Sequence, residues 1–173
     1  MENKISHDRI NSNYHRFYYM GIEIERKYLV KDSSYKQMCC NKSGIRQGFL
    51  SRVPERTVRV RVCNNKGYIT IKGKGEGVSH PEFEYEVPLD DALQMLELCE
   101  PPVIVKTRYI VPYDNNRWEV DEFHGDLQGL VVAELEIPSE DYRFSLPPFI
   151  GKEVTGDPRY YNSSLGVKAN RRK

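Results

Sequence analysis

Apolar and charged residues alternate at every second position in several segments of this chain. In residues 22–30 the charged positions on one face are Glu23, Glu25 and Lys27. The same alternation returns in four later segments: 58–62, 69–72, 83–87 and 133–137. Because successive side chains of a β-strand point to opposite faces, each segment predicts a strand with one apolar face and one charged face.

A charged strand face has an ordinary interpretation and a functional one. Antiparallel strands often bury one face and expose the other, and the exposed face is then polar. An ordinary exposed face, however, does not repeat Glu-x-Glu or Arg-x-Arg from strand to strand, because like charges two positions apart repel each other. The five segments together therefore favour a face on which cross-strand partners, bound cations or a bound polyanion offset this repulsion.

The predicted strands are numerous and joined mostly by short turns. Eight are expected, at 22–30, 44–50, 56–63, 67–74, 82–88, 103–111, 117–123 and 130–137. Short helices are expected up to residue 39, from Asp90 to about Cys99, and over 160–169. This pattern predicts a mainly β (α+β) protein, a closed eight-stranded antiparallel β-tunnel with a few flanking helices.

The charged faces can point outward, around an apolar barrel core, or inward, into a charged tunnel. The sixth strand carries Lys106 and Arg108 on one face, and the seventh carries Glu119 and Asp121. A closed interior brings carboxylates and cations close enough to compensate one another, which buried charges require. We therefore favour the charged interior.

Length and composition narrow the function classes. With 173 residues and a net charge of +1, the chain is expected to form one domain at 21–173, and neither nucleic acid nor a membrane is an expected partner. Residues 1–20 lack apolar periodicity and are expected to be a flexible N-terminal extension. The four cysteines lack metal-site spacing, which indicates reduced thiols and a cytoplasmic protein. A homodimer is left open.

The order of the charged motifs resembles a known family. The run 23–27 resembles the E-x-E-x-K signature of the CYTH superfamily, the triphosphate tunnel metalloenzymes, and 153–162 is similar to its short bacterial members. The later motifs follow in family order: Arg59-Val60-Arg61, Lys72, Glu84-Tyr85-Glu86, Lys106-Thr107-Arg108, Glu119-Val120-Asp121 and Glu134-Leu135-Glu136. The resemblance, over about 21–168, implies an enzyme that hydrolyses inorganic triphosphate or a small organic triphosphate with Mg²⁺ or Mn²⁺.

The resemblance also implies roles for individual residues. The phosphate-binding side chains would be Lys27, Arg59, Arg61, Lys72, Lys106 and Arg108. The metal ligands would be Glu23, Glu25, Asp121, Glu134 and Glu136. Lys106 and Glu25 are the catalytic candidates, and Lys106 would act as a base only with a lowered pKa. Simple phosphate binding is its plainer role, and Glu84 and Glu86 match acidic residues of the tunnel wall.

The chain departs in one place from the family that it resembles. Several short bacterial members have tyrosine in the second strand where this chain has Phe49, so a hydroxyl group for proton transfer is missing here.

His80 and His124 are near predicted turns and are interpreted as exposed loop residues rather than metal ligands.

Other functions remain open at this point. An adenylate cyclase-type enzyme would share the clamp and the metals, but it would also have to read a base or a ribose. A non-catalytic module that binds polyphosphate or RNA ends would need the cations without the carboxylates. Arg59 and Arg61 could also form a purely structural ladder with Glu84 and Glu86.

Overall fold

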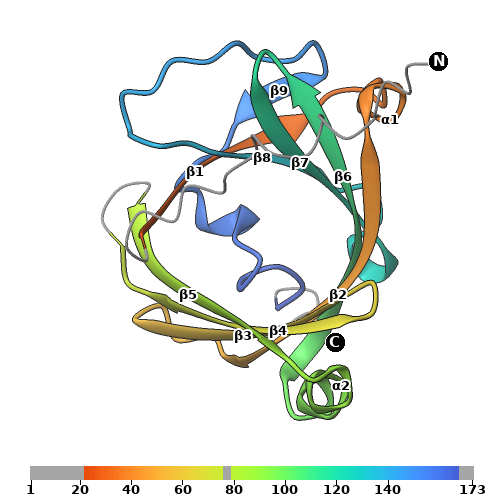
Figure 1. The fold of residues 1–173 in the computed structure, drawn as a ribbon, viewed down its shortest axis with the longest axis vertical. Helices are drawn as coiled ribbons and strands as arrows, with labels where there is room; N and C mark the ends of the chain where they lie inside the picture. The colour runs from red at the N-terminus through yellow and green to blue at the C-terminus, as the bar shows by residue number, and fades with distance from the viewer. Residues whose placement is uncertain (1–21, 76–78, 168–173) are drawn as a thin grey trace, which may run out of the picture.

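The computed structural model describes residues 22–75 and 79–167, and nine strands form this part of the chain (Figure 1). The predicted N-terminal extension, residues 1–20, lies outside the described residues. All eight predicted strands are present and β9 is additional. The bounds are β1 (Ile22–Val30), β2 (Asn41–Ser51), β3 (Arg56–Cys63), β4 (Lys66–Gly73), β5 (Ser79–Val87), β6 (Glu100–Tyr113), β7 (Asn116–Phe123), β8 (Val131–Glu136) and β9 (Ile150–Glu153).

Strands β1 to β8 close into a barrel, which Figure 1 shows end-on. Their hydrogen-bonded order is β5-β4-β3-β2-β6-β7-β8-β1, and the start of β1 then pairs with the start of β5. All of these pairings are antiparallel, and β9 adds to β1 outside the ring. The predicted closed eight-stranded antiparallel fold is therefore confirmed.

The charged rows of the strands face the inside of the barrel. The pairing register places Lys27 opposite Glu134, and residues that are directly opposite share one face of a sheet. Lys27, Glu134 and Arg108 all line one central cavity. The charged interior is confirmed.

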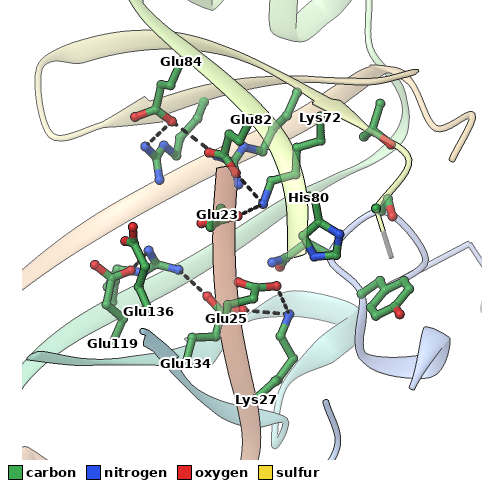
Figure 2. Close-up of a pocket in the computed structure, with 18 of the residues that line it drawn as sticks. Glu23, Glu25, Lys27, Lys72, His80, Glu82, Glu84, Glu119, Glu134 and Glu136 are labelled. Atoms are coloured by element: carbon green, nitrogen blue, oxygen red, sulfur yellow. Dashed lines mark hydrogen bonds and ion pairs between the residues drawn. The ribbon is translucent and has the colours of Figure 1, made fainter. Parts of the chain in front are cut away.

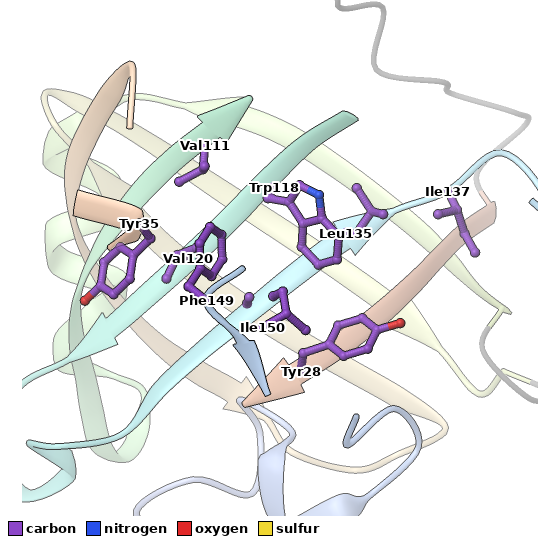
Figure 3. Packing of buried hydrophobic residues seen from close by; sticks show 10 residues of the cluster. Tyr28, Tyr35, Val111, Trp118, Val120, Leu135, Ile137, Phe149 and Ile150 are labelled. Atoms are coloured by element: carbon purple, nitrogen blue, oxygen red, sulfur yellow. The ribbon is translucent and has the colours of Figure 1, made fainter. Parts of the chain in front are cut away.

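The largest apolar core lies on the outer faces of β1, β6, β7 and β8 (Figure 3). Trp118 is fully buried, and its ring centroid lies 5.6 Å from that of Tyr28 and 5.8 Å from that of Phe144. Helix α1 (Tyr35–Met38) contributes Tyr35, and the segment 138–149 contributes Phe144 and Phe149. The helices therefore cover only part of the outer apolar rows, and a segment without helix or strand covers another part.

The helix predicted from Asp90 to about Cys99 is present as α2 (Leu89–Glu97), and it covers the outer faces of β3 and β4. Ala92 and Leu96 are four residues apart on one helix face and pack against Val60 and Val62. Among the described residues, neither helix is long and apolar enough to cross a membrane.

The prediction of a helix over 160–169 is wrong for the residues of this range that the structure describes, 160–167. A 3₁₀ helix, η2 (Pro158–Tyr160), is followed by turns up to residue 167. The Asp157 side chain accepts a hydrogen bond from the Arg159 backbone and caps η2, whereas Gly166 has a φ of +77°. A left-handed residue does not continue a helix, so the segment folds as turns.

One end of the barrel interior is apolar. Ile104, Phe123 and Val132 alternate in step with the inward charged residues of their strands, and they cluster with Phe49 of β2 and Leu165 of the C-terminal segment. In the end-on view of Figure 1 this segment crosses the ring of strands. Arg52 anchors it by donating a hydrogen bond of 2.6 Å to the backbone oxygen of Ser163. The charged cavity therefore has an apolar boundary.

Gly48 is a position where the fold tolerates no side chain. A Cβ atom there would lie 2.7 Å from Cβ and 2.8 Å from Sγ of Cys99. We expect Gly48→Ala to lower the free energy of unfolding by about 1–3 kcal/mol, the usual cost of overpacking. Gly44→Ala is the matched control on the same strand, because nothing lies within 4 Å of its Cβ position. Equal urea-denaturation midpoints for the two variants would contradict this expectation.

Candidate active site

A cavity of about 1140 Å³ runs through the barrel, and charged side chains from its strands line it. Figure 2 shows acidic and basic side chains interleaved around this cavity rather than separated into two halves. The predicted site residues that line it are Glu23, Glu25, Lys27, Arg59, Arg61, Lys72, Arg108, Glu134 and Glu136. The structure therefore brings nine of the predicted site residues together around one space.

Two arginines on β3 form one wall of the cavity. The Nη2 atom of Arg61 donates to Glu84 over 2.8 Å, and Arg59 reaches the same carboxylate oxygen over 3.3 Å. Thr70 also donates to this oxygen over 2.9 Å. The structure thus contains part of the arginine–glutamate ladder considered above, with Glu84 as its acceptor. Each guanidinium still has further donors for a ligand.

Two lysines are each held by a pair of carboxylates. The Nζ atom of Lys27 lies 2.9 Å from Glu134 and 3.6 Å from Glu25. Burial alone would lower the pKa of Lys27, but Glu134 and Glu25 raise it above its ordinary value. Lys72 contacts Glu23 and lies 2.6 Å from Glu82. Both lysines are therefore fully charged near neutral pH.

Arg108 is the most heavily coordinated cation of the site. Its guanidinium donates to Asp121 over 2.7 and 2.6 Å, to Glu134 over 3.1 Å, and to Glu119. Burial opposes its charge, yet these carboxylates raise the pKa of Arg108 well above its ordinary value. A single side chain from β6 thus links carboxylates of β7 and β8.

Lys106 and Asp121 lie deeper than the other predicted residues and are not among those that line the cavity. Both are almost completely buried, and their charged atoms are 2.5 Å apart. Burial lowers the pKa of Lys106 to about 8, even though Asp121 opposes the shift. A lysine with this pKa meets the condition set above for a base, but the structure places it behind the wall.

Glu82 is a site residue that the sequence analysis missed. It lines the cavity beside Glu23 and Lys72, whereas Glu86 is exposed and pairs with Lys66 over 2.9 Å. Burial raises the pKa of Glu23, although Lys72 opposes the rise. All three acidic positions of β5 fit the same alternation, which is the signal that could have found Glu82.

His80 is a second missed residue. It lies on β5, lines the cavity near Lys72, and is half-buried rather than an exposed loop residue (Figure 2). Burial lowers its pKa, and the charge of Lys72 lowers it further, so His80 is neutral at pH 7. Its position opposite Glu23 in the β1–β5 pairing was not visible in the local sequence.

The carboxylate set suits a hard divalent cation in its chemistry. Glu25 and Glu136 are directly opposite on β1 and β8, and Glu134 is two residues from Glu136 on the same face. Mg²⁺ and Mn²⁺ prefer such oxygen ligands. Within the described residues, however, no three acidic, histidine or cysteine side chains are arranged to hold a metal ion. The lysines and Arg108 pair with Glu23, Glu25 and Glu134 instead, so metal binding would require these ion pairs to rearrange.

The class of protein follows from this fold and site. Residues 21–161 match the CYTH domain family, and the chain belongs to that family. The closed antiparallel barrel and its charged interior are the features that the sequence motifs predicted.

Named relatives are similar over most of their length. An inorganic triphosphatase of Acetivibrio thermocellus is 50% identical over 149 residues, covering 84% of this chain and 94% of that protein. An inorganic triphosphatase of Nitrosomonas europaea is 33% identical over 150 residues, covering 84% of this chain and 97% of that protein. The crystal structure of an inorganic triphosphatase superposes with a TM-score of 0.59 at 32% identity, covering 83% of this chain and 93% of that one.

Proposed function

We propose that this protein hydrolyses inorganic triphosphate or a small organic triphosphate with the help of a divalent cation. The observation that carries the proposal is the cavity of the closed barrel, in which cations and carboxylates face the same space. A polyphosphate binder needs only the cations, because carboxylates repel its ligand, and a metal ion makes both sets useful together. The named relatives support triphosphate as the substrate class.

The basic residues would bind and orient the phosphate chain. Arg59 and Arg61 offer planar pairs of N–H donors, and Lys27 and Lys72 offer point charges from other strands. Phosphoryl transfer depends mainly on positioning and on stabilising the charge of the equatorial and leaving oxygens. Cations placed on several strands around one cavity can meet both needs.

The carboxylates would hold Mg²⁺ or Mn²⁺. Glu23, Glu25, Glu134 and Glu136 line the cavity, whereas Asp121 would act from behind the wall through Arg108. A bound divalent cation neutralises charge on phosphate oxygens and lowers the pKa of a bound water. Before substrate enters, Lys27, Lys72 and Arg108 neutralise Glu23, Glu25 and Glu134, which keeps an otherwise repulsive cavity stable.

A cytoplasmic location is also part of the proposal. The four cysteines in the described part of the chain are all free thiols. Free thiols persist in a reducing compartment, where disulfides are rare.

The test is a phosphate-release assay on the purified full chain. We expect turnover of inorganic triphosphate with Mg²⁺ or Mn²⁺, and loss of turnover with excess EDTA that either ion restores. Thiamine triphosphate and ATP should be run beside it, with products separated by chromatography. No turnover of any substrate would overturn the proposal, and cyclic AMP with pyrophosphate would favour the cyclase instead.

A further inference from the structure

Gln47 is a buried polar residue of the barrel interior that does not line the cavity. Its side chain on β2 is fully buried. Neither its amide nitrogen nor its amide oxygen has a hydrogen-bond partner among the residues that the structure describes. Buried polar groups are almost always paired, because an unpaired one keeps its whole desolvation penalty. An unpaired amide at this position therefore calls for a functional explanation.

The strand register places Gln47 beside the two arginines on β3 that form one wall of the cavity. Ile45 and Phe49, two residues away on either side, line the cavity, so Gln47 also points inward. Across the β2–β3 pairing it is directly opposite Arg61. Directly opposite residues have Cβ atoms about 4.5–5.5 Å apart and interact through their side chains.

Arg61 has a buried hydrogen-bond donor without a partner in the described part of the chain. Its Nη2 atom donates to Glu84, but its Nε atom is buried and has no partner within the described ranges. Gln47 therefore has a free acceptor, the amide oxygen, and the residue opposite it has a free donor. Arg59 is the diagonal neighbour of Gln47 and also has a buried Nε atom without a partner. Four of the buried polar atoms without a partner in the described part of the chain thus belong to Gln47 and the two arginines beside it.

We propose that Gln47 positions Arg61 for triphosphate binding: its amide oxygen accepts a hydrogen bond from the Nε–H of Arg61, directly or through one ordered water. This bond fixes the plane of the guanidinium and leaves its remaining N–H groups for phosphate oxygens. Gln47 is a positioning residue, because it does not line the cavity and acts through Arg61. The inference rests on the proposed function, since it deepens the phosphate clamp of the same site.

It is essential to this role that the amide carries no charge. A carboxylate at position 47 would orient the guanidinium equally well, but it would also neutralise the charge that attracts phosphate. Glu84 already neutralises part of the charge of Arg59 and Arg61. A neutral acceptor adds orientation without removing more positive charge.

The first test replaces the amide with an apolar group of similar length, in Gln47→Met. We expect about a tenfold rise in KM for inorganic triphosphate, with kcat within about twofold, because binding is lost and chemistry is not. The melting temperature of the ligand-free protein should be unchanged or higher, since an unpaired buried amide has been removed. Gln94→Met, on the exposed side of α2, is the matched control and should change neither quantity.

A binding measurement separates this inference from the proposed function. Calorimetry with inorganic triphosphate in EDTA measures the clamp without turnover, and we expect about a tenfold weaker Kd for Gln47→Met. If the wild type hydrolyses triphosphate but Gln47→Met binds it equally well, only the role of Gln47 is overturned. If the wild type neither binds nor hydrolyses triphosphate, both proposals are overturned. Gln47→Leu replaces Gln47→Met in every measurement if the latter yields no folded protein.

A double-mutant cycle tests whether Gln47 acts through Arg61. In an Arg61→Ala background the Nε–H donor is gone, so Gln47→Met should change the Kd for triphosphate by less than about twofold. The two substitutions would then be strongly non-additive. A tenfold effect of Gln47→Met in both backgrounds would show that the glutamine acts independently and would overturn the inference.

Discussion

Arg108→Ala is expected to lower the free energy of unfolding by about 3–5 kcal/mol and to reduce triphosphate hydrolysis to background. The substitution leaves the fully buried Asp121 with Lys106 as its remaining cation, and it leaves Glu134 with Lys27. Removing one partner of a buried ion pair costs more than the pair contributes, because the other charge stays buried. Urea denaturation and phosphate release measure the two effects.

Arg117→Ala is the control for this prediction. Arg117 also pairs with Glu119, but it lies at the rim of the cavity and its side chain is 46% exposed. Such an exposed ion pair contributes about 0–1 kcal/mol, so its loss should shift the denaturation midpoint only slightly. Similar losses of stability in the two variants would show that burial does not set the importance of Arg108.

The strands could be predicted because their signal is local. The alternation in 56–63 placed β3 at the observed bounds, Arg56–Cys63. The inward direction of the charges also followed from the sequence, since carboxylates such as Glu23 and Glu25 need cations close to them when they are buried. The structure provides Lys72 of β4 for Glu23 and Lys27 of the same strand for Glu25.

The sequence did not predict which acidic residues of β5 line the cavity. Glu82, Glu84 and Glu86 share one face of β5, and the local pattern does not distinguish them. The pairing with β4 decides, because it places Glu82 opposite Lys72 inside the barrel and leaves Glu86 at the exposed end. Such long-range register is absent from any short stretch of sequence.

The sequence also did not predict how deeply each inward side chain is buried in the barrel. Lys106 and Arg108 look alike in sequence, but Lys106 is opposite Phe123 at the apolar end and Arg108 is opposite Asp121 in the charged middle. The inward side chain of Lys106 is therefore covered, and its pKa is lowered to about 8 by burial. The sequence did not single out Gln47 for the same reason. Its role depends on its position opposite Arg61, which only the pairing of β2 with β3 reveals.

The division of the site into metal and phosphate residues gives the second large expected effect. Glu25→Gln should lower kcat/KM for triphosphate by about 10²-fold or more, because an uncharged amide is a poor ligand for Mg²⁺ or Mn²⁺. Raised Mn²⁺ should restore part of this loss by mass action. Arg59→Ala should cause a loss of similar size through weaker triphosphate binding, and added metal should not restore it, because the missing contact is cationic and directional.

Titrating Mn²⁺ against the activity of both variants separates the two roles. Glu25 is salt-bridged to Lys27 and lies opposite Glu136, whereas Arg59 lies on β3 next to Thr70 and Glu84. Because the two residues lie on different strands and contact different partners, the loss of one leaves the other's contacts intact. A shifted Mn²⁺ optimum is therefore expected for Glu25→Gln alone. The same response to Mn²⁺ in both variants, or full activity in both, would mean that these two residues do not divide metal binding and phosphate binding between them.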